Sequence, residues 1–409
     1  MPDRQGGRAQ ALLPLIGIAF GAELVAGAAV GWVRFLFGPT LRLGHGFPDF
    51  LLYYALARLE AARGFAHIYD QSAVLDFERR VTGVALGQPL PLTSPPYVAI
   101  LVRPLAALDF KTAYVLWALL SAVFLAVAIV ALVRASRLRG RSAWAVGLLA
   151  AAWAPTLVAG LQAQLAGLVL LGAALAALAW TRGREGRAGF ASILTLARPH
   201  LVLLLPVLFL VRRSGRAFGA LLAGAVVLFA VTLPVTGLRA WSDYVAVLTP
   251  GVLRGNQGFA NAEQAPFALR GVVEAVAGAS VLDVAIPFIL LIAVAVIVAR
   301  TPSRPLLDFA LVTVASFDAS LHQNLHDLTL LLVGLIPTAG LLLAGELRHR
   351  ATGWLAIGVC YVCADVGLVN QLLAAAGVQV LLAYLVWERL APVASPARSD
   401  SRQAQPSTG

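Results

Sequence analysis

The chain has 409 residues, of which 60% are hydrophobic and only 12% are charged. A water-soluble domain carries about 25% charged residues, so this composition excludes a soluble fold. The net charge of +11 comes almost wholly from arginines, which cluster in short loops between long apolar blocks. That pattern is typical of membrane topology and not of a nucleic-acid groove, so we expect no nucleic-acid partner.

Apolar blocks of about 18–25 residues match the hydrocarbon thickness of a bilayer at helical rise, and they predict an all-α polytopic membrane protein. The blocks lie at 11–33, 111–133, 142–157, 161–180, 217–235, 281–299, 306–321, 328–345, 353–369 and 371–388. A further block, 188–211, is interrupted by Arg198-Pro199-His200. Because proline removes a backbone donor, we predict two short helices there, and about twelve membrane-embedded helices in all.

Arginine-rich loops determine the predicted orientation, because such loops stay in the cytoplasm. Both termini are then cytoplasmic, and the segments 34–95 and 236–280 lie outside. Within the first, the helical spacing around 51–69 predicts an amphipathic helix along the membrane surface, and 97–108 predicts an interfacial or re-entrant helix. Residues 1–390 form one predicted domain, and the Ser/Pro/Gln-rich tail 391–409 is predicted to be a disordered cytoplasmic segment.

Asp49 lies in the segment GHGFPDF, shortly after the first predicted span. One interpretation is that Asp49 caps the helix that begins near Phe50, because Asp is a favoured N-cap. The other is a functional carboxylate, since apolar residues flank it and Tyr53 and Tyr54 follow after one helical turn. Ionisable groups in such settings are costly and usually face a cavity, so we favour the second interpretation.

Arginine and histidine side chains also occur at two other places within or beside apolar blocks. Arg198 and His200 flank the proline break, where they belong either to a solvated hairpin tip or to a site for an anionic headgroup, since arginine geometry suits phosphate. His322 and His326 stand four residues apart in a predicted external turn, so they would share one face if the following helix starts early. A zinc pair lacks an evident third ligand. We expect at least one of these histidines to be functional and no metal to be bound.

Two other features favour plain structural roles. Cys360 and Cys363 form a C-x-x-C pair, but there is no second pair and no histidine nearby, so we interpret them as packing residues. Glu23 lies near the middle of the first span among closely spaced small residues. It is either a proton-relay carboxylate or a hydrogen-bonding partner for a neighbouring helix, and we favour the latter.

The order of motifs resembles glycosyltransferase family 87, membrane enzymes of the GT-C superfamily that use polyprenyl-phosphate sugars. The matching features are the D-x3-Y pair Asp49 and Tyr53, Gly64, Tyr69, the segment Ser94-Pro95-Pro96-Tyr97, Pro104-Leu105-Ala106, Leu116-Trp117, the G-L-Q-A-Q run 160–164, Arg198-Pro199, Gly255-Asn256-Gln257 and the turn with His326. Each motif is loose, and their order and spacing over about 49 to 345 carry the resemblance. Two substitutions, Gln164 for Asn and Arg198 for Lys, keep an amide and a cation.

The resemblance implies a GT-C-like bundle that transfers a mannosyl or arabinosyl unit from a polyprenyl-phosphate donor to a lipid-linked or cell-envelope glycan acceptor. It implies that Asp49 is the catalytic residue, acting as general base. We assign the donor phosphate to Arg198, His200, His322 and His326, and the sugar or acceptor to Tyr53, Gln162, Gln164, Asn256 and Gln257. No cofactor is expected, and no dinucleotide-binding motif is encoded.

Two other classes remain open. A transporter or lipid flippase also has many helices, a broken helix and intramembrane charges. Against it, the sequence lacks two similar halves, and the long external segment after the first span is unusual for a carrier. The third possibility is a membrane scaffold without activity, which would be indifferent to the replacement of Asp49 by Asn.

Overall fold

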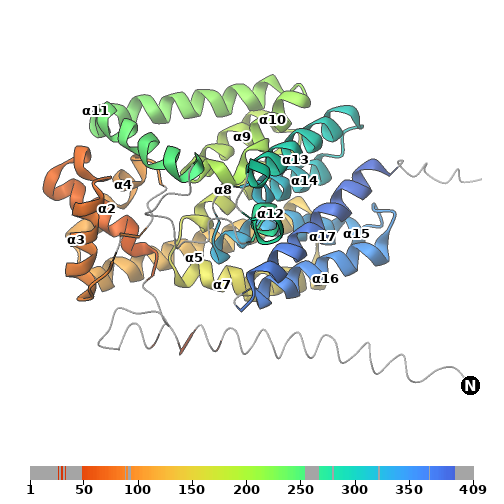
Figure 1. Ribbon diagram of the computed structural model, residues 1–409. Coiled ribbons are helices and arrows are strands. Elements are labelled where there is room, and N and C mark those ends of the chain that lie inside the picture. Colours follow the sequence, from red (N-terminus) through yellow and green to blue (C-terminus); the bar gives the residue numbers. More distant parts are fainter. Residues whose placement is uncertain are drawn as a thin grey trace, which may run out of the picture.

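The computed structural model describes residues 48–87, 89–90, 94–253, 267–278, 281–320, 323–367 and 369–391, with 26, 29–30 and 33. These residues form helices and the turns between them, without a strand (Figure 1). The predictions for Glu23, Asn256, Gln257, His322 and the C-terminal tail lie outside the described residues, as does almost all of the first predicted span.

Three helices form one end of the bundle, seen at the left of Figure 1: α2 (Phe50–Arg63), α3 (Gln71–Thr82) and α4 (Tyr97–Val102), with the 3-10 turns η1 (Phe65–His67) and η2 (Arg103–Ala107). The predicted helix near 97–108 is therefore present. The predicted amphipathic helix is not α2, whose side chains are mostly buried, including Glu60. Periodic Leu and Ala suit a packed helix equally well. The amphipathic helix is α3, which Asp70 caps through the backbone N–H groups of Ser72 and Ala73.

The remaining elements make up the bundle. They are α5 (Phe110–Ala135), α6 (Gly140–Ala152), α7 (Ala154–Leu161), α8 (Ala166–Thr181), α9 (Glu185–Ala191), η3 (Ser192–Ala197), η4 (Pro199–Val202), α10 (Leu204–Val211), α11 (Gly215–Leu253), α12 (Leu269–Ala277), α13 (Val281–Arg300), α14 (Pro305–Asp318), η5 (Leu325–Leu331), α15 (Leu332–Leu343), α16 (Arg350–Val366) and α17 (Gln371–Leu390).

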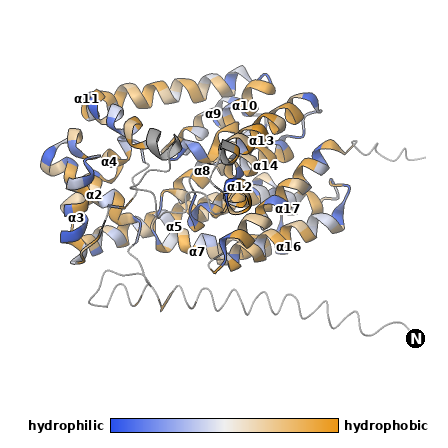
Figure 2. Cartoon of the chain, in the orientation of Figure 1, coloured by the Kyte–Doolittle hydropathy of each residue, from blue (hydrophilic) through white to orange (hydrophobic). Residues whose placement is uncertain are grey.

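The described residues contain four helices long and apolar enough to cross a bilayer, and up to five if the bent pair α6–α7 counts as one span. They are Phe110–Ala135, Gly215–Val247, Leu325–Leu343 and Gln371–Leu390. Helix α5 exposes Leu119, Val123, Val127 and Val130, which recur at helical spacing along one face. Apolar residues dominate the helices in Figure 2. A polypeptide with such an outer surface is a membrane protein.

A bend of 55° separates α6 from α7. The predicted blocks 142–157 and 161–180 placed the helix boundary too late, because the interruption is at Trp153, whose backbone is extended. Pro155 has no N–H and occupies the first turn of α7, where no intrahelical donor is needed. The chain therefore starts a new helix, which continues to Leu161.

The interruption predicted within 188–211 is present. Arg198 has φ −145° and ψ 73°, and it separates the 3-10 turns η3 and η4. Because the backbone leaves the helix there, the Arg198 side chain is directed by a fixed turn between two short helical segments.

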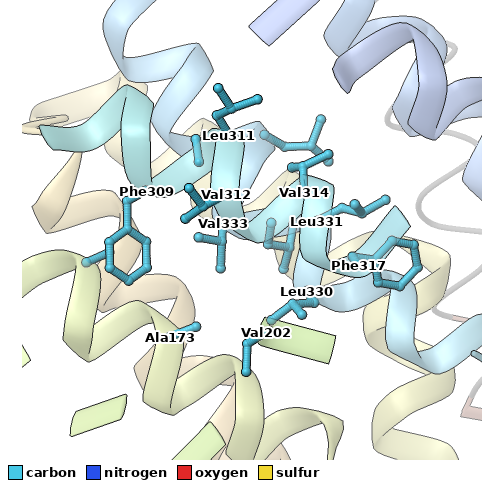
Figure 3. Packing of buried hydrophobic residues seen from close by; sticks show 14 of the residues in the cluster. Ala173, Val202, Phe309, Leu311, Val312, Val314, Phe317, Leu330, Leu331 and Val333 are labelled. Carbon is cyan, nitrogen blue, oxygen red and sulfur yellow. The ribbon is translucent and has the colours of Figure 1, made fainter. Parts of the chain in front are cut away.

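Helix α14 lies at the centre of the core, with every residue from Leu307 to Asp318 buried. Figure 3 shows its side chains meeting those of η5 and α15, with Val202 of η4 beside Leu330. The last residue of α14, Asp318, accepts hydrogen bonds from the backbone N–H of Leu269 (3.0 Å) and the side chain of Gln379 (2.5 Å). These bonds attach α12 and α17 to the core.

Candidate active site

Asp49 immediately precedes α2, but its carboxylate makes no capping bond to that helix, which rules out the capping interpretation. Gln162 satisfies the first turn instead. Its side-chain Oε1 accepts from the Asp49 backbone N–H (2.9 Å), and its carbonyl oxygen accepts from that of Phe50 (3.1 Å). Because another residue fills the N-terminal acceptor role, the Asp49 carboxylate stays available for other partners.

The first of these partners is Gln164, whose Nε2 donates to Asp49 Oδ2 across 2.5 Å. The Tyr53 hydroxyl donates to Oε1 of the same amide, which fixes its orientation. Burial raises the pKa of Tyr53 above its ordinary value, so the phenol remains a donor. Both ends of the Gln164 amide are therefore engaged in holding Asp49.

The turn that carries Gln162 and Gln164 is itself fixed from α5. Trp117 Nε1 donates to the carbonyl oxygen of Ala163 (2.9 Å), and the Tyr114 hydroxyl donates to that of Leu161 (2.5 Å). Ala163 has φ 50°, a left-handed conformation that an alanine adopts at a cost of about 1–2 kcal/mol. The aromatic donors help to hold this turn against Asp49.

Three residues from the η3–η4 break and from η5 complete the site. His326 Nδ1 lies 3.4 Å from Asp49 Oδ2, and its Nε2 lies 3.4 Å from Asp327 Oδ1. Arg198 Nη1 forms a buried ion pair with Asp327 and lies 3.1 Å from His326 Nε2. Asn324 and Asp327 form a reciprocal capping box at the start of η5. The histidine ring thus lies between two carboxylates.

The arginine contact determines the histidine tautomer. A guanidinium has no acceptor and does not lose its proton, so His326 Nε2 accepts from Arg198 and Nδ1 carries the hydrogen. That hydrogen faces Asp49. A neutral His326 therefore donates toward the carboxylate, while Arg198, itself paired with Asp327, keeps the ring in this orientation.

Exposure distinguishes the residues of this cluster. The Asp49 side chain is 27% exposed, whereas those of Arg198, His326 and Asp327 are 4% exposed or less. The buried residues compensate each other: Arg198 pairs with Asp327, and His326 bridges toward Asp49. The carboxylate that can reach an incoming molecule is that of Asp49, and a positioned carboxylate can accept a proton from a hydroxyl group.

The structure brings together six of the residues predicted from the sequence: Asp49, Tyr53, Gln162, Gln164, Arg198 and His326. His200 is half-buried in η4 and close enough to Asp327 for an electrostatic interaction. Asp327 was missed as a site residue. Its signal was a carboxylate next to His326 inside an apolar block. No group of three or more His, Cys, Asp or Glu residues in the described part of the chain has the arrangement of a metal site.

The sequence profile of glycosyltransferase family 87 matches residues 93–323, which is more than half of the chain. This protein therefore belongs to glycosyltransferase family 87, and the class of enzyme is a glycosyltransferase. Neither the comparison with curated proteins nor that with solved structures gives a match. The matched segment contains Gln162, Gln164 and Arg198 but not Asp49 or His326, so the case for those two residues depends on geometry.

Proposed function

We propose that this glycosyltransferase moves a hexosyl unit, mannosyl first, or a pentosyl unit from a polyprenyl-phosphate donor to a lipid-linked or cell-envelope glycan acceptor. The reaction takes place at the non-cytoplasmic face of the cell membrane, and both chain termini lie in the cytoplasm. The observation that carries the proposal is the partly exposed Asp49 carboxylate, held by Gln164 and facing His326 amid buried residues.

The chemistry is a single displacement. Asp49 takes the proton from an acceptor hydroxyl as its oxygen attacks the anomeric carbon of the donor sugar. The bond between that carbon and the phosphate oxygen breaks, and its electron pair leaves with the lipid phosphate. The new glycosidic bond therefore has inverted configuration. The hydrogen bond from Gln164 fixes the carboxylate in position for the attack.

The leaving phosphate gains negative charge, so cations placed beside it stabilise the transition state. The contacts of Arg198 with the described residues use Nη1, which leaves Nη2 and Nε to meet a phosphate oxygen. His326 and His200 both lie close to Asp327. His322, Asn256 and Gln257 belong to the same proposed site as further phosphate and sugar contacts, together with Tyr53 and Gln162.

A lipid-phosphate donor also fits the apolar outer surface of the bundle. Its polyprenyl chain stays in the bilayer while the sugar phosphate meets the polar cluster. No cofactor is required for this displacement. No metal is required either, because the leaving group is a lipid monophosphate and not a diphosphate.

The test is to incubate the purified protein with radiolabelled polyprenyl-phosphate mannose, or polyprenyl-phosphate arabinose, and a panel of membrane lipid acceptors. We expect a labelled glycolipid with inverted anomeric configuration from one of the donors. A transporter or flippase would instead move the donor across vesicles without a new glycosidic bond. That outcome, or labelled product only from nucleotide sugars, would overturn the proposal.

A further inference from the structure

A cavity lies at the C-terminal end of α5, whereas Asp49 lies near the N-terminal end of that helix. It has a volume of about 430 Å³ and is lined by the ends of α5, α8 and α15, the start of α14 and the turn into α6. Helix α5 begins at Phe110, whose ring packs against Phe50 beside Asp49, and it ends at Ala135 in the cavity wall. Its 26 residues span about 39 Å, so the two sites are separate.

The cavity is basic. Arg137, Arg139 and Arg304 line it, against one carboxylate from Glu346. Arg304 is held in place by two carbonyl oxygens, those of Glu388 (3.0 Å) and Glu346 (2.9 Å), which orient the guanidinium without neutralising it. Within the described part of the chain, no carboxylate forms an ion pair with Arg137 or Arg139. The lining therefore has an excess of positive charge.

Arg137 occupies a position where the backbone favours glycine. Helix α5 ends in a turn in which Leu138 N–H bonds to the Val133 carbonyl (3.2 Å) and Arg137 has φ 57°. Helices α8 and α15 end at the same side in the same way, but with Gly183 (φ 67°) and Gly345 (φ 73°) at that position. An L-residue in this conformation costs about 1–2 kcal/mol. Helix α10 ends in the same turn with Arg213 (φ 55°), so two arginines bear this cost, and only Arg137 lines the cavity.

The other wall of the cavity is apolar. Leu306 and Leu341 line it, and Leu343 stands at its rim with 47% of its surface exposed. Helix α5 and the segment Leu325–Leu343, which consists of η5 and α15, both end here, and each is long and apolar enough to cross a bilayer. Ends of such helices lie at the depth of the lipid headgroups. The cavity thus combines cations with an apolar exit at the level where phospholipid phosphates are found.

We propose that this cavity binds a phosphate-bearing group, and that its occupant is an anionic membrane phospholipid. Arg137, Arg139 and Arg304 contact the phosphate, and the first part of an acyl chain lies against Leu341 and Leu343. Arginines suit this role because their planar fork donates two hydrogen bonds to phosphate oxygens. The site is distinct from the cluster around Asp49 and does not depend on the transfer reaction.

The test uses the double variant Arg137→Gly/Arg139→Gln of the full chain in neutral detergent, with phosphatidylglycerol as the probe. Glycine suits the left-handed turn, so the variant should fold with an unchanged or higher thermal midpoint. Binding of phosphatidylglycerol, measured by native mass spectrometry and by the thermal shift it causes, should weaken about tenfold or more. The control is Arg141→Gln, which removes an exposed arginine of the same segment that does not line the cavity.

Two further probes separate the possible sources of the phosphate. Phosphatidylcholine should protect the wild-type protein much less than phosphatidylglycerol, and inorganic phosphate should give little protection at equal concentration. Equal protection by inorganic phosphate would overturn the assignment to a lipid. Equal weakening in Arg141→Gln and in the double variant would show general surface attraction, and it would overturn the site itself.

Discussion

Gln164 and Asp49 are 115 residues apart in the chain, and the amide of the first donates to the carboxylate of the second across 2.5 Å. The same amide accepts from the Tyr53 hydroxyl. The amide therefore cannot turn over without losing both bonds. Its nitrogen stays toward Asp49, and the carboxylate is held in one orientation before any substrate arrives.

Tyr53→Phe should lower the rate of transfer without abolishing binding. The phenylalanine leaves Oε1 of Gln164 without its donor, so the amide is held only by its bond to Asp49 and fixes the carboxylate less firmly. We expect kcat to fall about tenfold, which corresponds to the loss of one buried hydrogen bond, with little change in KM. Steady-state kinetics on the purified variant measures both constants.

Tyr54→Phe is the matched control for that variant. The Tyr54 hydroxyl donates to the carbonyl oxygen of Leu108 (2.7 Å), so its removal also costs one hydrogen bond in α2, but away from Asp49. It should leave kcat unchanged. A similar fall in kcat for both variants would mean that α2 simply loosens, and the orienting role of Tyr53 would be wrong.

Removing one partner of the Arg198–Asp327 pair should be costly because both side chains are buried. Asp327→Asn leaves an uncompensated guanidinium and should lower the free energy of unfolding by about 3–5 kcal/mol. Asp243→Asn is the comparison, because it breaks the exposed Arg239–Asp243 pair at 3.7 Å and should cost about 0–1 kcal/mol. Thermal unfolding in detergent compares the two. If both variants were equally stable, the buried ion pair between Arg198 and Asp327 would be wrong.

Gly189 lies where α9 packs closely against α11. A Cβ atom there would lie 2.0 Å from the carbonyl oxygen of Ala217, so Gly189→Ala must displace backbone. We expect a loss of about 1–3 kcal/mol or more in the free energy of unfolding. The control is Gly219→Ala. Gly219 lies in α11, the helix that α9 contacts, but a Cβ atom there meets open space, so the change should be neutral or stabilising by about 0.5–1 kcal/mol. Equal unfolding temperatures for the two variants would contradict the close packing.

Glu78 gives the amphipathic helix α3 a predictable pH dependence. Burial raises the pKa of its carboxyl from 4.5 to about 7, although the Leu90 backbone N–H donates to it across 3.1 Å. The folded protein then holds this proton more tightly than the unfolded chain. The stabilising contribution is full below about pH 4.5 and is lost as the pH rises through about 7.

Glu78→Gln removes this titration. Relative to wild type, the variant should gain up to about 3 kcal/mol between pH 4.5 and pH 8. Asp70→Ala should show the opposite trend. Hydrogen bonds from Ser72 lower the Asp70 pKa, so the stability it gives is present at neutral pH and lost on acidification. Urea unfolding at both pH values measures the difference in stability between each variant and the wild type. If that difference for Glu78→Gln did not depend on pH, the raised pKa of the buried Glu78 carboxyl would be wrong.

Much of the candidate site was predictable because ionisable side chains within apolar sequence cost free energy to bury. Asp49, Arg198 and His326 are each ionisable and flanked by apolar sequence, and the break at Pro199 follows from proline chemistry. Asp327 was harder to assign, since a carboxylate beside His326 gives no sign of a partner 129 residues away. The roles of Gln162 and Gln164 in holding Asp49 also required the three-dimensional arrangement.

The fold was predictable in class but not in detail. Apolar blocks indicate membrane helices, but hydropathy does not locate the bend at Trp153, where an extended residue and Pro155 start a new helix inside one block. Helical spacing of apolar residues likewise does not separate the buried α2 from the amphipathic α3. That difference depends on which neighbours cover each face.

The central claim is that Asp49 is the general base. The most direct measurement compares transfer of radiolabelled mannose from polyprenyl-phosphate mannose by the wild-type protein, Asp49→Asn and Asp109→Asn. Asp109 caps α5 at the same end of the bundle through Thr112 N–H, and it is exposed. We predict that Asp49→Asn folds normally but loses about 10²–10⁴-fold in kcat, while Asp109→Asn retains wild-type turnover. An Asp49→Asn variant that transfers mannose at the wild-type rate would contradict the account.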